Sequence, residues 1–319
     1  MSGPMTCEDE QLVHLFTVPF DAKSGHPTAF GAVHRCAHCG RACVSPMPDI
    51  DQIPAHYDIP AYYTHNTSHL PEVTPSLMDR LVTHLAWRTD HAHPFDLQKD
   101  IPFVPQDRTG LDIGCGHGNL LSNMRDLGLE TFGIDPDEQA RAEAEKKGHR
   151  VFTGTAETLP GAIASGTFDV ITMTHVLEHC LNPLEALKNA RALLSPDGMF
   201  YCEVPNAGSL YFQTYGQISE MLDVPRHLFF FGKTDLQDLA SRAGLEITGW
   251  RFHGLTRHFG AGWKAWENSI HARLIDAGIT PSCAPRSFLG DLKLLAAGLG
   301  RAPELRYDSI GFTAHRAGA

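Results

Sequence analysis

Long apolar runs and basic blocks are both missing from this sequence of 319 residues. The sequence has no run of eighteen apolar residues, the length needed to cross a bilayer, and no signal-peptide pattern at its N-terminus. A soluble cytoplasmic protein is therefore expected. Acidic residues (37) outnumber Lys and Arg (26), and no Lys- or Arg-rich block occurs. Because nucleic-acid binding depends on neutralising phosphates, this charge balance argues against a nucleic-acid partner.

Several catalytic signatures are also missing. The sequence has no G-x-S-x-G turn, no G-x-x-x-x-G-K-[S/T] loop and no H-E-x-x-H pair. These absences argue against hydrolases with a nucleophile elbow, P-loop nucleotide hydrolases and zinc peptidases.

A glycine-rich turn lies between a predicted strand and a predicted helix. Residues 111–119 read LDIGCGHGN. Because glycine has no Cβ, the backbone at Gly114, Gly116 and Gly118 can approach a ligand closely. Seventeen residues after Gly118, Asp135 ends the next predicted strand, where its carboxylate can accept hydrogen bonds from both hydroxyls of a ribose. The pattern predicts a nucleoside site.

The spacing and charge of this turn favour one ligand. Asn119 stands where the dinucleotide pattern G-x-G-x-x-G has its third glycine. Asp112 would repel a pyrophosphate but would suit a cationic amino acid. S-adenosylmethionine (SAM) carries an ammonium, a sulfonium and a ribose and no phosphate, so SAM is the predicted cofactor.

An ordered series of segments resembles the class I SAM-dependent methyltransferases. LDIGCGHGNLL (111–121), GIDPDE (133–138), GTAETLP (154–160), FDVITMTHVLEH (168–179) and LLSPDGMFYCEVPN (193–206) resemble successive motifs of that family. The resemblance covers about residues 105–254. It implies an α/β fold with a doubly wound, mostly parallel seven-stranded sheet, and the alternation of predicted strands and helices agrees with it.

The resemblance also implies roles for residues at the carboxyl ends of the strands. Asp112 would face the methionine ammonium, Asp135 the ribose and Ala156 the adenine, while Glu157 would accept from the adenine amino group or cap a helix. The full set expected to bind the cofactor is Asp112, Gly114, Cys115, Gly116, Gly118, Asn119, Asp135, Pro136, Ala156, Glu157 and Thr174.

Three histidines are candidate general bases for a direct methyl transfer. His175 and His179 follow the fourth predicted strand, and His227 lies in the connection after the fifth. His227 and His179 are the first choices, and packing or capping is the alternative role. The segment 175–179 also resembles one in quinone-biosynthesis O-methyltransferases in which acids and a histidine hold a divalent ion, although His175 replaces the first acid here.

Residues 1–70 are predicted to form a separate zinc-knuckle-like module. Cys36 and Cys39 precede Gly40 in a C-x-x-C-G turn, and Cys7 and Cys43 are further thiols that could complete a tetrahedral site. The segment resembles the N-terminal zinc module of sugar and secondary-metabolite methyltransferases, which usually has two such knuckles. Structural zinc and a degenerate knuckle without metal are therefore both open.

The spacing of apolar residues divides the rest of the chain into two predicted regions. Residues 71–104 are predicted to be a helical cap or linker, with a helix in 74–98 that buries Leu77, Met78, Leu81, Val82 and Leu85 on one face. Residues 105–319 are predicted to be the methyltransferase domain, and residues 255–303 a helical insertion before its last strand.

The predicted function is methylation of a small molecule, on oxygen, with a histidine as general base. A sugar, a lipid-linked intermediate and a secondary metabolite are the substrate classes considered. Three alternatives remain: transfer to carbon or nitrogen, an RNA methyltransferase that uses the cysteine knuckle, and a cofactor-binding partner or sensor without activity. Fold resemblance supports cofactor and reaction type better than substrate.

Overall fold

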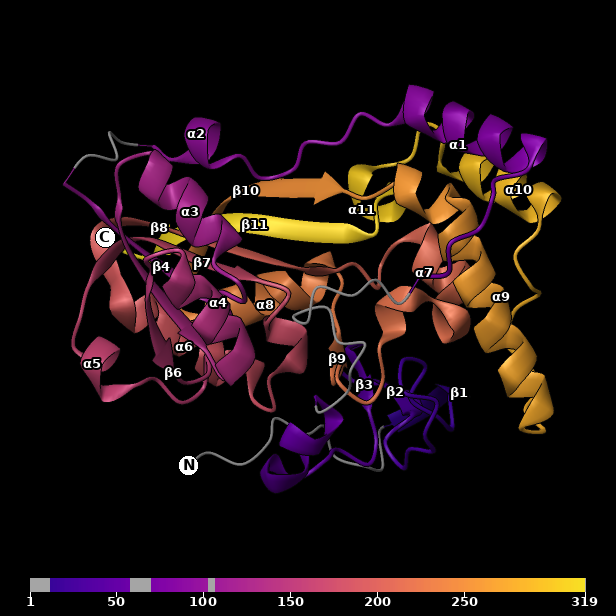
Figure 1. Cartoon of the computed structure of the whole chain (residues 1–319), viewed down its shortest axis with the longest axis horizontal. Coiled ribbons are helices and arrows are strands. Elements are labelled where there is room, and N and C mark those ends of the chain that lie inside the picture. Colours follow the sequence, from indigo (N-terminus) through magenta and orange to yellow (C-terminus); the bar gives the residue numbers. More distant parts are fainter. Residues whose placement is uncertain (1–11, 58–69, 103–106, 319) are drawn as a thin grey trace.

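The computed structural model describes residues 12–57, 70–102 and 107–318 (Figure 1). Its main element there is a seven-stranded sheet with strand order β10-β11-β8-β7-β4-β5-β6. The neighbours among β4 to β8 are parallel, and β11 is antiparallel to β8 and β10. The predicted mostly parallel α/β fold is confirmed. The strands are β4 (Thr109–Ile113), β5 (Glu130–Asp135), β6 (Arg150–Thr153), β7 (Phe168–Thr174), β8 (Leu194–Pro205), β10 (Leu245–His253) and β11 (Ser309–Arg316).

The helices that connect these strands begin and end at local sequence signals. The Asn182 side chain accepts from the Glu185 amide at the start of α6, and Pro183 occupies the first turn. Gly244 ends α8 with a φ of +74°, a left-handed conformation that favours glycine. The connecting helices are α3 (Asn119–Asp126), α4 (Glu138–Lys146), α5 (Gly161–Ala164), α6 (Pro183–Leu193) and α8 (Lys233–Ala243).

A second, antiparallel sheet contains strands from both sides of the predicted domain boundary. Its strands are β1 (Leu12–Thr17), β2 (Ala32–Cys36), β3 (Ala42–Val44) and β9 (Phe229–Phe230), in that order. The strand β9 comes from the connection after β8, so residues of the predicted C-terminal domain (105–319) complete the N-terminal sheet. Val33, Val44 and Ile113 belong to one continuous buried core, so the two sheets share their apolar interior.

Helices from three parts of the chain gather beyond the carboxyl ends of the parallel strands (Figure 1). They are α1 (Leu77–Thr89), α7 (Leu210–Tyr215), α9 (Ala261–Asp276), α10 (Phe288–Gly298) and α11 (Pro303–Arg306). A buried ion-pair group joins two of them: Arg286 bonds to Glu267 of α9 and to Asp291 of α10. The short helix α2 (Leu97–Asp100) lies in the linker that leads from α1 to β4.

The expectation for the helix before the core is partly wrong. The helix α1 ends at Thr89, and only Val82 and Ala86 are buried. The side chains of Leu77, Leu81 and their apolar neighbours on the same arc are exposed, because α10 and the turn 256–259 cover only one side of the helix. Among the described residues, no helix combines the length and apolar character needed to span a membrane.

Candidate active site

The glycine-rich turn directly follows β4 and is held against β5. The amides of Gly114 and Cys115 donate to the Ile134 carbonyl at 2.7 and 3.1 Å. The φ angles of Gly114, Gly116 and Gly118 are +75°, +51° and +73°, so the turn uses the left-handed freedom of glycine. A Cβ placed on Gly116 would meet no atom within 4 Å, which leaves open space beside the backbone.

Asp135 closes the turn from the end of β5. Its carboxylate accepts hydrogen bonds from the Gly116 amide at 2.8 Å and from the Asp137 amide at 2.9 Å. Burial raises the pKa of Asp135, and these two amides partly offset that rise. Asp135, the residue predicted to bind the ribose, is therefore in direct contact with the predicted glycine turn.

Asp112 lies buried on β4, beside the turn. Thr172 is its partner in the register with β7 and donates its hydroxyl to the carboxylate at 2.6 Å. Burial raises the pKa of Asp112 to about 7, although the Thr172 bond lowers it. A neighbouring cation such as an ammonium would favour the charged form. Thr172 was not predicted as a site residue, because its role depends on the register between two strands.

Ala156 and Glu157, which are predicted to contact the adenine, also form hydrogen bonds with residues of α6 and its start. The Glu157 carboxylate accepts from the Asn182 amide at 2.6 Å and thereby helps to begin α6. The Ala156 carbonyl accepts from the Asn189 side chain at 2.9 Å. The capping role considered for Glu157 is present in the structure, and its contact with adenine stays a prediction.

The other predicted cofactor residues surround the same turn. Cys115 is buried against the Gly133 backbone, and Pro136 is exposed beside Asp135. The Asn119 side chain accepts from Lys147 at 2.8 Å. Thr174 is half-buried at the last position of β7.

His175 follows β7 and is held between two carboxylates. Its Nδ1 donates to Glu178 at 3.3 Å, and its Nε2 lies 3.7 Å from Glu203. Burial alone would lower the pKa of His175, but the two carboxylates outweigh it and raise the pKa. Its φ of +55° is uncommon for a residue other than glycine, and strained backbone of this kind is concentrated at functional sites.

Glu203, on β8, is the second carboxylate at this edge and was given no role from the sequence. Its carboxylate accepts from His253 of β10 at 2.9 Å and from the hydroxyl of Tyr201. Burial raises the pKa of Glu203, but the His253 hydrogen bond and the charge of His175 outweigh it and bring the pKa to about 2. The segment 193–206 contained Glu203, but only the sheet shows that His253 lies next to it.

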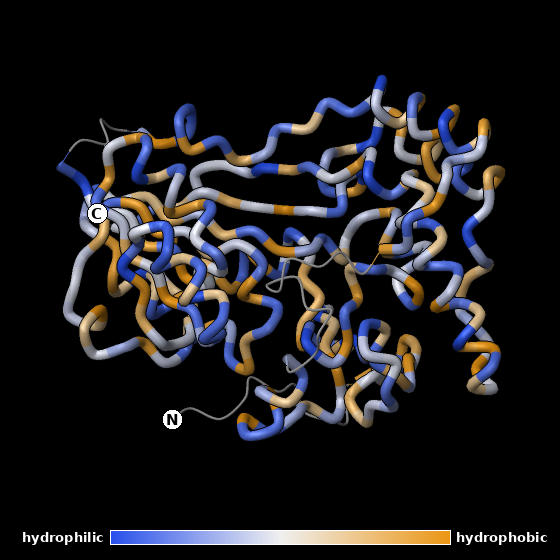
Figure 2. Tube along the Cα trace, viewed as in Figure 1, coloured by the Kyte–Doolittle hydropathy of each residue, from blue (hydrophilic) through white to orange (hydrophobic). Residues whose placement is uncertain are grey.

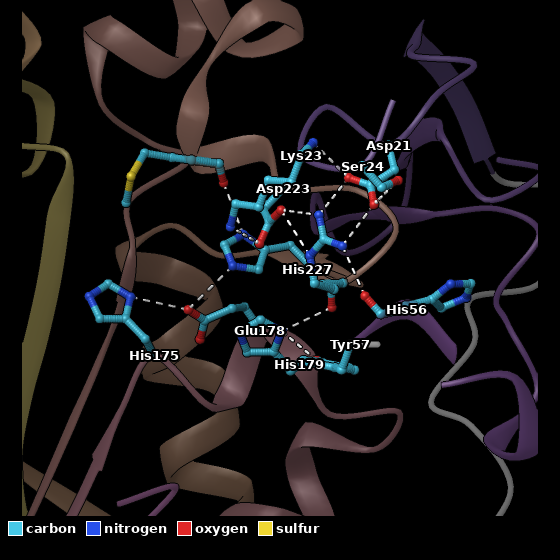
Figure 3. Close-up of polar contacts among 12 residues, drawn as sticks. Asp21, Lys23, Ser24, His56, Tyr57, His175, Glu178, His179, Asp223 and His227 are labelled. Atoms are coloured by element: carbon cyan, nitrogen blue, oxygen red, sulfur yellow. Dashed lines mark hydrogen bonds and ion pairs between the residues drawn. The ribbon is translucent and has the colours of Figure 1, made fainter. Parts of the chain in front are cut away.

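His179 and His227 pack together on the other side of Glu178 (Figure 3). Their ring centroids are 4.6 Å apart, and Nε2 of His227 lies 3.9 Å from a Glu178 oxygen. Their Nδ1 atoms donate to the carbonyls of Arg226 and Met221 at 3.1 and 2.9 Å, which leaves the Nε2 atoms as acceptors. Burial lowers the pKa of both rings to about 4, so both are neutral at pH 7.

Glu178, His179 and His227 could hold a metal ion. One ligand atom from each residue can be chosen so that all lie within 4.8 Å of one another. The second Glu178 oxygen is buried and has no hydrogen-bond partner among the described residues. Neutral imidazoles held by backbone carbonyls, together with a carboxylate, are suitable ligands for a divalent cation.

Arg226 joins the N-terminal part of the chain to the segment that carries His227. Its partners Asp21, His56 and Asp223 are labelled in Figure 3. Its fully buried guanidinium donates to Asp21 at 2.7 and 2.9 Å, to Asp223 at 2.6 Å and to the His56 carbonyl at 2.9 Å. Lys23 completes the group with a 2.8 Å bond to Asp223. Two cations and two carboxylates therefore balance in the interior, one residue away from His227.

The cysteine turn of the predicted knuckle connects β2 and β3. The Cys39 amide donates to the Cys36 sulfur at 3.4 Å, and Gly40 turns the chain with a φ of +78°. Cys43 lies on β3, opposite His34 in the register. Cys7 lies outside the described residues, and the three described thiols do not form a metal-ligating group at the distance found for Glu178 and its neighbours.

Comparison with known proteins agrees with the geometry. A family model described as a methyltransferase domain matches residues 77–249. The ubiquinone biosynthesis O-methyltransferase of Cereibacter sphaeroides is 32% identical over 189 residues, which are 56% of this chain and 73% of the relative. The enzyme of the same name from Ruegeria pomeroyi is 31% identical over 224 residues, or 66% and 86% of the two chains. A solved SAM-dependent methyltransferase from Thermotoga maritima is 19% identical, with a TM-score of 0.45 over 75% of this chain and 91% of the other.

The family match includes the glycine turn, Asp135 and the histidine cluster. It covers more than half of the chain, and the sheet it implies is the one observed. The chain belongs to the methyltransferase domain family and is a SAM-dependent methyltransferase.

Proposed function

We propose that this enzyme methylates a hydroxyl oxygen of a small molecule, with His175 as the general base. The observation that carries the proposal is the position of His175 beside the cofactor turn. A Cβ on Gly114 would lie 2.3 Å from a methyl carbon of Val176, so the loop that begins at His175 packs directly on the turn. Sugars, lipid-linked intermediates and secondary metabolites remain the substrate classes considered.

SAM, when bound, supplies an electrophilic methyl group on its sulfonium. The enzyme's own contribution is to align the substrate oxygen with that methyl group and to remove the hydroxyl proton. In this proposal Nε2 of His175 takes the proton as the carbon–oxygen bond forms and the carbon–sulfur bond breaks. Glu178 orients the ring through Nδ1 and stabilises the imidazolium that results.

The structure favours His175 over the two histidines preferred from the sequence. His227 is buried, whereas His175 is only partly buried, and the lowered pKa of about 4 makes both His179 and His227 weak bases. His175 is about one third exposed at its side chain and has carboxylates on both sides. We propose that His179 and His227 form the wall of the site next to Glu178.

Metal-assisted activation of the substrate is a second candidate for the same step. It is favoured by the unpartnered Glu178 oxygen and by the two available Nε2 atoms. A divalent ion there would lower the pKa of a coordinated hydroxyl and replace the base. Activity lost with a chelator and restored by one divalent metal, in wild type but not in His227→Ala, would support the metal.

The cofactor site can be tested before the substrate is known. Titration calorimetry with SAM and its demethylated product, with NAD as the control ligand, should give micromolar binding of the first two only. Asp135→Asn should weaken SAM binding at least 10-fold, because the ribose loses a charged acceptor. The matched control is Asp126→Asn, which changes an exposed acid of α3. Equal SAM binding by both variants would contradict the assigned site.

Turnover separates the remaining alternatives. A screen of hydroxyl, amine and carbon nucleophiles with labelled SAM identifies the acceptor atom. If SAM binds but no acceptor is methylated, the protein is a silent cofactor-binding partner, and His175→Gln will change nothing measurable.

We also infer that Cys36 and Cys39 are ligands of a structural zinc ion, with Cys7 and Cys43 as further candidate ligands. The bond from the Cys39 amide to the Cys36 sulfur supports this, because such bonds stabilise a thiolate. Elemental analysis should find zinc in wild type and in Cys283→Ser, and none in Cys36→Ser. Metal-free wild-type protein would indicate the degenerate knuckle.

A further inference from the structure

The helix α1 exposes more apolar surface than the fold covers. Leu77 is 83% exposed, Met78 53% and Leu81 47%, and all lie on one arc with Leu85. The helix packs beside α10, whose Leu289 is 67% exposed. Figure 2, in the same view as Figure 1, shows these two helices at an outer edge of the molecule. Large apolar side chains exposed together on one helix face indicate an interaction site.

Exposed basic residues accompany this apolar arc. Arg80 and Arg88 are exposed on α1, and Lys293 is exposed on α10. The acids of the two helices point elsewhere: Asp79 and Asp291 both bond to Lys264. These exposed residues together are called the α1–α10 face. It is apolar and basic in a chain whose net charge is −11. Its members are Leu77, Met78, Arg80, Leu81, Leu85, Trp87, Arg88, Leu289 and Lys293.

We propose that the α1–α10 face docks on a lipid surface with anionic headgroups. A helix with leucines on one side, arginines beside them and an exposed tryptophan has the pattern of a helix that lies in the membrane interface. Anionic lipids attract each basic residue near the surface. The fit rests on charge complementarity between this face and the lipid.

A second copy of the chain fits this face less well. In a symmetric dimer the same patch meets itself, so the basic residues around Arg80 and Arg88 would approach one another. Like charges brought together in this way destabilise the contact. The proposal does not depend on which atom the enzyme methylates.

Vesicle sedimentation with the full chain tests the proposal. The probes are vesicles of phosphatidylcholine alone and of phosphatidylcholine with 30% phosphatidylglycerol. We expect at least 10-fold stronger binding to the anionic vesicles, and binding that weakens as salt is raised. The triple variant Leu77→Ser, Leu81→Ser, Leu85→Ser and the double variant Arg80→Glu, Arg88→Glu should each lower this affinity at least 10-fold.

The matched control removes three exposed apolar side chains elsewhere: Val13→Ser, Ile50→Ser and Ile275→Ser. It should bind vesicles as wild type does. All variants should keep the wild-type SAM affinity and unfolding midpoint, which shows that they fold. No preference for anionic vesicles, or equal loss in the control, would overturn the proposal. A dimer seen by analytical ultracentrifugation that depends on the three leucines, without vesicle binding, would overturn it too.

Discussion

Arg226→Gln should destabilise the protein strongly. The guanidinium is fully buried and bonds to two carboxylates, and the glutamine side chain cannot replace its charge. Removing one partner of a buried ion pair typically costs about 3–5 kcal/mol, because the other charge stays buried without compensation. Lys23 still balances Asp223, so Asp21 is left with the larger deficit.

A double-mutant cycle separates this electrostatic cost from lost packing. Asp21→Asn combined with Arg226→Gln removes both charges, so the pair should be more stable than the sum of the single changes indicates. We expect a coupling free energy of about 1–3 kcal/mol in urea unfolding followed by circular dichroism. The control is Arg150→Gln, whose exposed pair with Glu130 should change the free energy of unfolding by about 0.5 kcal/mol or less.

The effect has a defined pH dependence. Burial opposes ionisation of Asp21 and Asp223, but Arg226 and Lys23 outweigh burial and lower both pKa values. A lowered folded-state pKa stabilises the protein above the ordinary Asp value of about 4, and that stabilisation is lost as the pH falls below it. The gap between wild type and Arg226→Gln should therefore be full at pH 7 and narrow below about pH 4. A gap under about 1 kcal/mol at pH 7 would refute the reasoning.

Three further predictions concern the site itself. Glu178→Gln removes a carboxylate that raises the pKa of His175, so the acidic limb of the kcat/KM profile should move to lower pH, whereas an unmoved limb would assign the base elsewhere. Thr172→Val removes a hydrogen bond that lowers the pKa of Asp112, so less of the carboxylate should be charged at pH 7. Calorimetry should then show a lower SAM affinity at pH 7 that recovers at higher pH. An equal loss of SAM affinity at both pH values would indicate misfolding. Gly114→Ala should lower the unfolding free energy by about 1–2 kcal/mol or more, because alanine at a φ of +75° is strained and its methyl group would clash with the loop after β7; a neutral change in thermal unfolding would contradict this.

The sheet and the glycine turn after β4 could be predicted because their signals are local. Alternating apolar segments define the strands, and a glycine turn followed by Asp135 carries its chemistry within a short stretch of sequence. The start of α6 and the end of α8 were equally readable from Asn182, Pro183 and Gly244. In each case the residue types at neighbouring positions determine the backbone.

Contacts between distant segments could not be predicted in this way. Arg226 and Asp21 are 205 residues apart, and neither position has a local pattern that names the other. Thr172 meets Asp112 only through the register of β7 on β4, and Glu203 meets His253 only through the order of the strands. For α1 the apolar spacing predicted that a helix is present. Spacing alone cannot show where the helix ends or how much of its apolar arc the neighbouring elements cover.

Distant contacts also join the N-terminal segment to the loop that carries Arg226 and His227. Tyr57 places its hydroxyl 3.0 Å from Nδ1 of His179, and the His56 carbonyl accepts from Arg226. The strand β9, two residues after His227, completes the N-terminal sheet. The loop that carries Arg226 and His227 is therefore fixed on both sides by residues from the first 57 positions. We therefore expect a change in the N-terminal sheet to act through these contacts on His179 and His227, the proposed wall of the substrate site.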